Sequence, residues 1–200
     1  MAKIQRQLHP EIPERFSGAL WLELRDSWCL LMAAATCLLL TLPLDKFFPA
    51  WLLAAVLALL ALGDYRYGLL YDSLVLLLFV LGIVPLSCGA VTWLEAVGGS
   101  LLGGGLLYAV RQLSHGGLGL GDVKLIAALG PWLGWQNIIL CLLLSSCLGT
   151  AYGLVRLLQG KMTRHTALPF GPFLALGAVL AFVWGDSCWR FWEALYVSLW

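Results

Sequence analysis

Long apolar runs separated by short polar stretches dominate this chain of 200 residues. Hydrophobic residues make up 61% of the sequence and charged residues only 12%. A water-soluble globule cannot build a polar exterior from so few charges, so the composition predicts a protein embedded in a lipid bilayer. The net charge of +1 gives no electrostatic footprint for nucleic acid, which we therefore exclude as a partner.

The apolar runs predict an all-α fold, a polytopic membrane helix bundle with about seven transmembrane helices. Several runs are shorter than the ~20 residues that a spanning helix usually needs. The shortest, 123–135, reaches only about 20 Å of a hydrocarbon layer that is ~30 Å thick. The predicted spans are residues 28–43, 49–63, 73–90, 94–110, 123–135, 137–157 and 167–184.

The basic residues orient these spans. With a cytoplasmic N-terminus, all Lys and Arg residues except Lys46 and Arg190 fall on the cytoplasmic side, as the positive-inside rule requires. If 123–135 did not cross the membrane, three of these cations would change sides. We therefore expect seven crossings and a cytoplasmic N-terminus.

Two amphipathic segments flank the predicted bundle. Residues 14–26 alternate apolar with charged side chains, which predicts a helix lying in the membrane interface. The tryptophan-rich stretch "CWRFWEALYVSLW" predicts an aromatic belt segment at the opposite surface. We expect an N-terminal cytoplasmic or interfacial segment over 1–27 and one membrane-embedded domain over 28–200.

The cysteines and histidines do not predict a metal site. None of the six cysteines forms a CxxC pair and most lie in apolar runs, so we expect buried small side chains. The histidines are His9, His115 and His165, and they show neither an HExxH motif nor clustered spacing. We expect them in loops.

Two carboxylates arrive at one predicted face of the membrane at similar depth. Asp64 closes the run 49–63 and Asp122 opens the run 123–135. Carboxylates a few ångströms apart cannot both ionise and share one proton. The charged member can then take a proton from water while the neutral member polarises a peptide carbonyl, so hydrolysis needs no metal and no cofactor.

Structural roles remain open for each acidic residue at this face. Asp72 and Ser73 directly precede a long apolar run, which favours capping of a helix start. Asp122 can cap its own helix in the same way, and Asp64 can simply end a span. Lys124, two residues after Asp122, points to another side of the helix, so we expect it to reach the interface.

The glycines around Asp122 favour the functional alternative. In "GLGLGDVKL", Gly119 and Gly121 free the backbone to turn sharply or to admit another chain closely, as a peptide substrate requires. The stretch lacks the GxxxxGK[ST] pattern and no strand precedes it, which argues against a nucleotide site.

Two of these segments resemble the type IV prepilin peptidases, membrane aspartic proteases with a GxGD signature. "GLGLGDVKLIAALGPWLGWQ" is similar to the family's Gly-x-Gly-Asp-x-Lys-Leu block. "LGDYRYGLLYDSLVLLLFVLGIV" looks like the family's first-aspartate segment, with Asp64 in the catalytic position and Asp72 eight residues further on. The residues that match the first block are Gly119, Gly121, Asp122 and Lys124.

A third segment, "LPFGPFLALGA", resembles the family's later Phe-Gly-Pro element through Phe170, Gly171 and Pro172. The resemblance covers roughly residues 55–180. It implies that Asp64 and Asp122 are catalytic. The residues that it implies bind substrate or shape the site are Gly119, Gly121, Asp72, Lys124, Phe170, Gly171 and Pro172.

The resemblance implies a substrate class and a location. The family cleaves basic leader peptides from prepilins or pseudopilins, for type IV pili or type II secretion, at the cytoplasmic face of the bacterial inner membrane. Asp72 is then a possible contact for the basic leader. Many members also N-methylate the new terminus and carry a CxxC-rich cytoplasmic insert, which is not found in this sequence, and this counts against methylation.

Two alternatives remain open. A presenilin-like or signal-peptide-peptidase-like protease would pair Asp122 with Asp72, through "LYD" and "LGLGD", although the Pro-Ala-Leu element of that group is not found. A proton-coupled transporter or a non-enzymatic scaffold would use paired aspartates as relay groups, but no internal repeat supports it.

Overall fold

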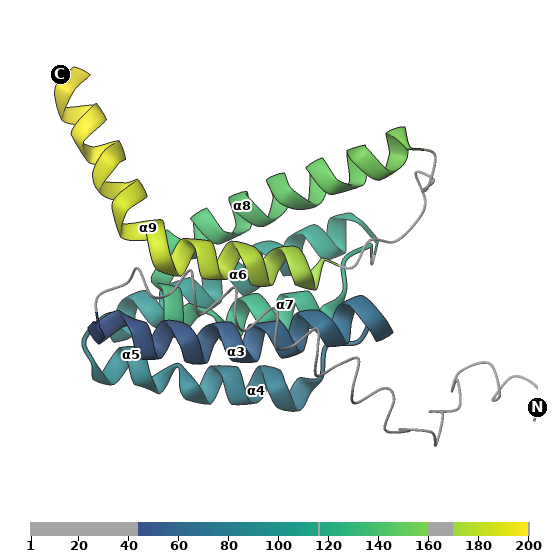
Figure 1. Cartoon of the computed structure of the whole chain (residues 1–200), viewed down its shortest axis with the longest axis horizontal. Helices are drawn as coiled ribbons and strands as arrows, with labels where there is room; N and C mark the ends of the chain where they lie inside the picture. The colour runs from purple at the N-terminus through teal and green to yellow at the C-terminus, as the bar shows by residue number, and fades with distance from the viewer. Residues whose placement is uncertain (1–43, 116, 160–169, 200) are drawn as a thin grey trace, which may run out of the picture.

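Every regular element in the described part of the chain is an α-helix. The computed structural model describes residues 44–115, 117–159 and 170–199. The all-α prediction is therefore confirmed for these residues (Figure 1). The helices are α3 (Leu44–Tyr67), α4 (Asp72–Leu81), α5 (Ile83–Ser87), α6 (Trp93–Leu113), α7 (Leu120–Ala128), α8 (Gly130–Leu158) and α9 (Gly171–Leu199).

Four of these helices are long and apolar enough to cross a membrane. They correspond to the predicted spans 49–63, 94–110, 137–157 and 167–184. The structure places the candidate spans at Phe48–Tyr65, Trp93–Leu113, Gly130–Leu158 and Gly171–Ser198. The predicted number of seven is not confirmed, since the other three predicted spans lie outside the described residues or are interrupted.

Several sequence predictions concern residues that the structure does not describe. The interfacial helix over 14–26 and the first span over 28–43 lie outside the described residues. The same holds for His9 and His165. These assignments stay predictions.

The predicted span over 73–90 is divided at Gly82 into α4 and α5. A Cβ atom on Gly82 would lie 2.6 Å from the Cβ of Pro131, so α4 and α5 meet against the start of α8. Pro85 removes one backbone donor from α5. The apolar stretch Asp72–Ser87 is consequently shorter than the four candidate spans.

The predicted span over 123–135 is not one helix either. α7 has nine residues, so it extends about 14 Å. After α7, Gly130 packs so closely on α6 that a Cβ atom there would lie 2.4 Å from the Ser100 backbone nitrogen. Gly134 then interrupts α8 with a φ of 67° and a ψ of 174°, a conformation that glycine adopts without strain. The prediction that 123–135 crosses the membrane on its own is not confirmed.

The core lies between these helices and is built from large apolar side chains. Trp132 is 1% exposed, and its indole N–H donates to the Leu78 carbonyl over 2.8 Å, which ties α8 to α4. On α6, Gly99 and Gly103 let α8 approach closely, as small residues do between membrane helices. Buried apolar residues include Leu60, Leu78, Leu125, Leu129, Ile138 and Leu174.

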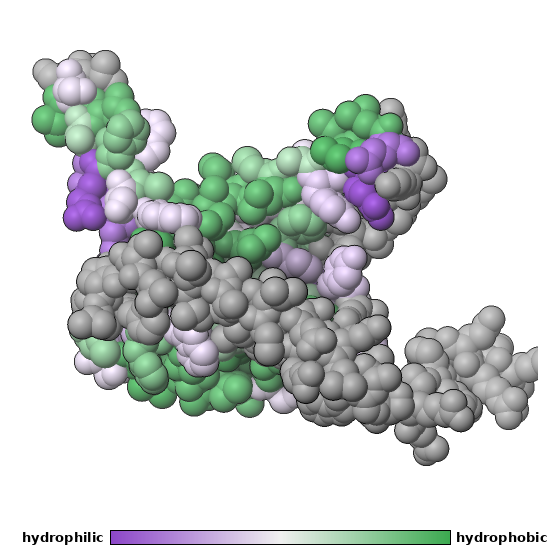
Figure 2. Space-filling model, viewed as in Figure 1, coloured by the Kyte–Doolittle hydropathy of each residue, from purple (hydrophilic) through white to green (hydrophobic). Residues whose placement is uncertain are grey.

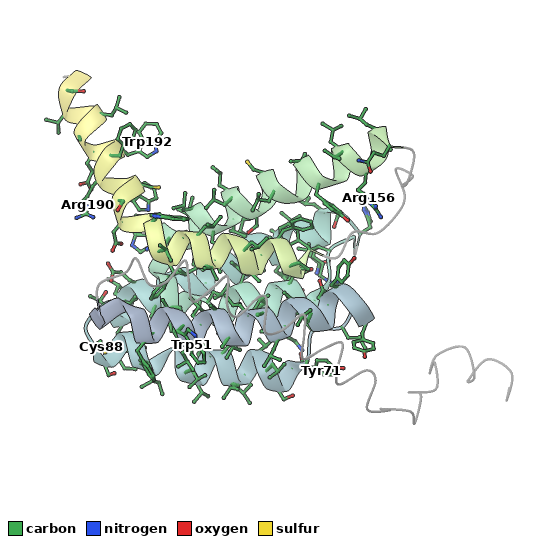
Figure 3. The ribbon with its side chains drawn as sticks, viewed as in Figure 1. Trp51, Tyr71, Cys88, Arg156, Arg190 and Trp192 are labelled. Atoms are coloured by element: carbon green, nitrogen blue, oxygen red, sulfur yellow. The ribbon has the colours of Figure 1, made fainter. Side chains whose placement is uncertain are left out.

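The outer surface of the bundle is apolar, as expected for contact with lipid. Figure 2 shows hydrophobic residues over much of α8 and α9 and along the edge where α4 lies, with hydrophilic residues on the projecting half of α9 and at the far end of α8. The tryptophan-rich stretch predicted as a separate belt segment continues α9 without a break to Leu199. Figure 3 shows Arg190 and Trp192 on this half of α9, which leaves the bundle.

For the cysteines of the described residues, the prediction of burial holds only in part, while Cys29 and Cys37 lie outside these residues. Cys141 is buried between α8 and α9, where its thiol lies 3.8 Å from the Leu174 carbonyl oxygen. The prediction is wrong for Cys88, Cys147 and Cys188, which are exposed. An apolar sequence context alone therefore does not distinguish buried from exposed cysteines.

Several helix ends meet at one end of the molecule. α3 and α6 end there, and α4, α7 and α9 begin there, on the right-hand side of Figure 1. Figure 3 shows Tyr71 and Arg156 at this end and Cys88 at the other. Both aspartates singled out in the sequence belong to this end.

Candidate active site

Asp64 lies near the C-terminal end of α3 and is 8% exposed. Its Oδ2 atom accepts a hydrogen bond of 2.9 Å from the backbone N–H of Gly171, the first residue of α9. The first N–H groups of a helix have no partner within the helix, so they are available to bind an anionic oxygen. The start of α9 therefore fixes the orientation of the Asp64 carboxylate.

Asp122 lies in the first turn of α7 and is 6% exposed. The backbone N–H of Gly119, the N-cap residue, hydrogen-bonds to its carboxylate. This contact joins Asp122 to the residue before α7, but the N-cap residue itself is Gly119, so the prediction that Asp122 caps its helix is not confirmed. Its Oδ1 atom is buried and has no hydrogen-bond partner among the described residues.

The two carboxylates interact electrostatically. Asp122 precedes the apolar part of α7 and lies outside the four candidate spans. Burial and, to a smaller extent, the negative charge of Asp64 raise the pKa of Asp122 to about 7, against the opposing effect of the Gly119 N–H. Two interacting carboxylates of this kind can hold one proton between them, with one carboxylate able to accept a proton and one carboxyl group able to donate a hydrogen bond.

Burial distinguishes these two residues from other polar groups. In the described part of the chain, the buried polar or charged side chains are Asp64, Asp122 and Ser145. Ser145 lies elsewhere, within α8, and its hydroxyl donates to the Cys141 carbonyl over 2.6 Å. Buried charges inside membrane proteins are costly and usually functional.

The backbone approaches these carboxylates closely at two glycines. A Cβ atom on Gly171 would lie 2.6 Å from the Asp64 Oδ2 atom, and one on Gly119 would lie 3.1 Å from the Asp122 Oδ2 atom. Gly121 has another role, since its Cβ would lie 2.8 Å from the Cβ of Leu70. The three glycines that the family resemblance singled out therefore all lie at close backbone contacts within or beside the pair.

Asp72 and Lys124 form an ion pair beside the site. The Lys124 Nζ atom lies 2.8 Å and 2.7 Å from the two carboxylate oxygens of Asp72. Their side chains are 51% exposed for Lys124 and 70% exposed for Asp72. The prediction that Asp72 or Ser73 caps α4 is wrong, because the N-cap residue is Tyr71 and no side chain of the described residues caps this helix.

Phe170 and Pro172 flank the hydrogen-bonding Gly171. Phe170 packs against the core, and its carbonyl accepts the backbone N–H groups of Phe173 and Leu174 in the first turn of α9. Pro172 follows directly, where a missing N–H is harmless. Both residues help to begin α9 where Gly171 meets Asp64.

Two contacts at this end were not predicted from the sequence. One is the hydrogen bond from the Gly171 N–H to Asp64, because side-chain patterns do not report the direction of backbone groups. The other is the hydrogen bond that the Arg111 guanidinium donates to the Leu118 carbonyl in the turn between α6 and α7. His115 lies in the same turn with a φ of 51°, so its predicted place in a loop is confirmed.

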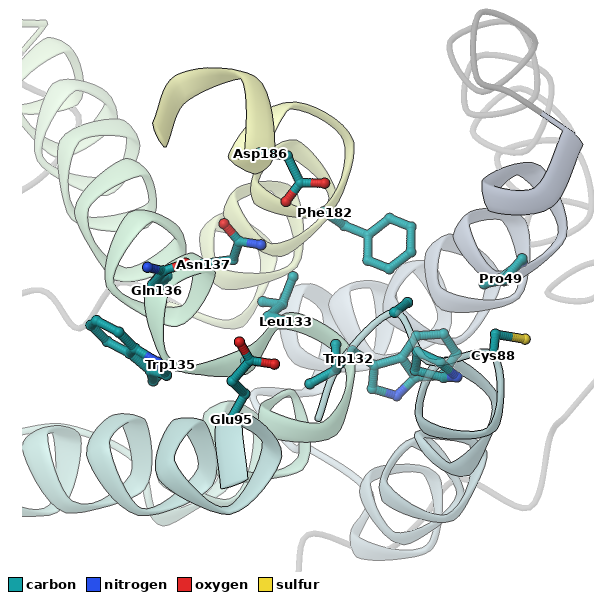
Figure 4. Close-up of a pocket in the computed structure, with 14 residues that line it drawn as sticks. Pro49, Cys88, Glu95, Trp132, Leu133, Trp135, Gln136, Asn137, Phe182 and Asp186 are labelled. Atoms are coloured by element: carbon teal, nitrogen blue, oxygen red, sulfur yellow. The ribbon is translucent and has the colours of Figure 1, made fainter. Parts of the chain in front are cut away.

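A pocket at the opposite end of the bundle is separate from this site. It has a volume of about 470 Å³ and lies where α3 and α6 begin. Figure 4 shows Glu95, Asn137 and Asp186 among its lining side chains. Glu95 closes a capping box with Thr92 at the start of α6, so it has a structural role there.

Comparison with known proteins supports the family that the sequence resembles. The model of the type IV leader peptidase family matches residues 51–154, which include both aspartates. The chain is 42% identical over 130 residues to the prepilin leader peptidase/N-methyltransferase of Stutzerimonas stutzeri, covering 62% of this chain and 45% of that protein. The protein of the same name from Aeromonas hydrophila is 40% identical over 147 residues, covering 70% of this chain and 51% of its own length.

The likeness extends to a more distant organism. The prepilin leader peptidase/N-methyltransferase of Bacillus subtilis is 31% identical over 143 residues, covering 71% of this chain and 58% of that protein. The chain spans about half the length of the curated relatives it matches. No solved structure matches it. On the family match and these relatives, the chain belongs to the type IV leader peptidase family.

Proposed function

We propose that this protein is a membrane aspartic endopeptidase that cleaves the leader peptide of type IV prepilins or pseudopilins. The observation that carries the proposal is the pair of buried carboxylates, Asp64 and Asp122, at one end of an apolar helix bundle. The relatives that share this region are named prepilin leader peptidases.

The pair can hydrolyse a peptide bond with one shared proton. The charged carboxylate takes a proton from water as the water oxygen attacks the scissile carbonyl carbon, and the neutral carboxyl group donates a hydrogen bond to the carbonyl oxygen. Collapse of the tetrahedral intermediate breaks the C–N bond, and a proton passes from the pair to the leaving amine. The pair returns to its single-proton state.

We assign the site to the cytoplasmic face of the bacterial inner membrane. Four cations lie near helix ends at the end of the bundle that holds the aspartates, namely Arg66, Arg111, Lys124 and Arg156. Arg190 lies on the half of α9 that leaves the bundle at the other end (Figure 3). The positive-inside rule therefore supports a cytoplasmic location for the site.

The geometry favours Asp64 over Asp72 as the partner of Asp122. The side chain of Asp72 is 70% exposed and both of its oxygens accept from Lys124, whereas Asp64 is buried beside the start of α9. A presenilin-like arrangement, in which Asp72 and Asp122 do the chemistry, would need a different conformation of this end.

The proposal is tested with purified protein in liposomes and a prepilin that carries its leader. Asp64→Asn and Asp122→Asn should each lower the cleavage rate by about 10²- to 10⁴-fold or more, the range that acid–base groups contribute. Asp186→Asn, at the opposite end, is the matched control and should cleave at the wild-type rate. Cleavage by Asp64→Asn together with loss of cleavage in Asp72→Asn would contradict the assignment and favour the presenilin-like pair.

A further inference from the structure

A short loop joins α3 to α4 directly beside the two carboxylates. It begins at Gly68, whose φ of 61° turns the chain and whose N–H donates to the Asp64 carbonyl over 2.8 Å. This is a common way to end a helix. The loop continues through Tyr71, the N-cap residue of α4.

The loop contacts the residue that precedes each aspartate. On one side, a Cβ atom on Gly63 would lie 3.3 Å from the Leu69 carbonyl oxygen and 3.3 Å from the Tyr71 ring. On the other side, a Cβ atom on Gly121 would lie 2.8 Å from both the Cβ and the Cδ1 atoms of Leu70. The loop thus lies between α3 and α7 at the level of the carboxylates.

An ion pair fastens the end of this loop to α7. Asp72 is the first residue of α4, and both of its oxygens accept from Lys124, which lies two residues after Asp122. Because Lys124 already neutralises Asp72, the pair is poorly suited to capture a basic leader peptide. Its contacts instead connect the loop to the helix that carries Asp122.

We propose that residues 68–71, fastened by the Asp72–Lys124 ion pair, act as a spacer that sets the separation of Asp64 and Asp122. This inference rests on the proposed peptidase function. Asp72, Lys124 and Leu70 are then positioning residues, because they act through the backbone of α3 and α7 and touch no reacting atom. A change in the spacer alters the geometry of the carboxylate pair and slows the chemical step, while substrate binding is retained.

The first test removes and then restores the ion pair. Asp72→Asn and Lys124→Gln should each lower kcat about 10-fold, since small misplacements of catalytic groups carry large costs, with KM within about twofold of wild type. The charge-swapped variant Asp72→Lys/Lys124→Asp should recover kcat to within about threefold of wild type, because it restores the contact.

The outcomes of this test separate the spacer from a leader contact. A raised KM with unchanged kcat in Asp72→Asn would overturn the spacer and indicate direct binding of the leader. Wild-type kcat and KM in both Asp72→Asn and Lys124→Gln would also overturn the spacer. A charge-swapped variant whose kcat is no higher than that of the single variants would overturn it too. If wild-type protein fails to cleave prepilin, the proposed function fails first, which is a distinguishable result.

The second test uses the close contact between Leu70 and Gly121. Gly121→Ala should lower kcat, because the new methyl group meets Leu70 and pushes the loop away from α7. The nearest atoms include the Leu70 Cβ, so only Leu70→Gly clears the space fully, and the double variant Leu70→Gly/Gly121→Ala should cleave faster than Gly121→Ala alone. Gly105→Ala is the matched control, because no described residue outside its own helix turn has an atom within 4 Å of its Cβ position. Wild-type kcat in Gly121→Ala, or a double variant no faster than Gly121→Ala, would overturn the spacer.

Discussion

Asp122 combines a buried side chain with incomplete hydrogen bonding. Its Oδ1 atom has no partner among the described residues, while its carboxylate receives the Gly119 N–H. A buried polar atom without a partner costs about 1–3 kcal/mol, and more when it is charged. The neutral carboxyl form relieves this cost. Asp122 is therefore the member of the pair that we expect to hold the shared proton at rest.

The proton on Asp122 predicts how cleavage depends on pH. Burial and the charge of Asp64 raise its pKa to about 7, so the singly protonated pair is present below that pH and is lost above it. The cleavage rate should therefore fall by about tenfold for each pH unit above about 7. A kcat profile measured from pH 6 to 9 checks this, and a rate that stays constant across that range would contradict a shared proton.

The two aspartates could be predicted from the sequence, but their hydrogen-bond partners could not. Asp64 and Asp122 stand at the edges of apolar runs, where a charge is informative, and one topology brings both to the same face. The Asp72–Lys124 pair joins residues 52 positions apart, which no local pattern reports. Backbone donors such as the Gly171 N–H are equally invisible in a sequence.

At the scale of elements, apolarity predicted where helices lie better than where they break. The apolar runs 73–90 and 123–135 each predict one membrane span. Close packing divides the first run at Gly82 and the second at Gly130, and Gly134 then interrupts α8. Hydropathy measures the preference of a segment for lipid, whereas a helix break depends on contacts with distant residues. These interruptions place the short α7 inside the bundle, with Asp122 at its start.

The start of α9 gives a prediction at this scale. Gly171→Ala should lower kcat by about tenfold or more, because the new Cβ would lie 2.6 Å from the Asp64 Oδ2 atom and must displace the carboxylate or the helix start. Kinetic assays of the purified variant measure this. Gly153→Ala in α8 is the control, since among the described residues only its own helix turn lies within 4 Å of its Cβ position. Wild-type kcat in Gly171→Ala would show that the contact is dispensable.

At the scale of the whole molecule, the bundle has two different ends. One end contains the aspartate pair and most cations of the described helices. The other end contains the pocket lined by Glu95 and Asn137. Charge distribution of this kind orients membrane proteins during insertion. The orientation also decides which compartment supplies the substrate.

This orientation predicts which residues are accessible from each side. In a variant that keeps only Cys88, at the pocket end, a membrane-impermeant maleimide should label intact spheroplasts. In a cysteine-free background, His115→Cys, in the turn between α6 and α7 at the end that holds the aspartates, should be labelled only after the membrane is opened. Labelling of His115→Cys in intact cells would place the site on the outer face and contradict the proposed location.

The coupling between Asp64 and Asp122 is tested most directly by infrared spectroscopy of the protein in liposomes, without substrate. The carbonyl band of a protonated carboxyl group should disappear as the pH rises through about 7, and it should be missing in Asp122→Asn. In Asp64→Asn the same band should disappear at a lower pH, because the negative charge that raises the pKa of Asp122 has been removed. A band whose pH midpoint does not change in Asp64→Asn would show that the two carboxylates do not share a proton and would contradict the catalytic pair.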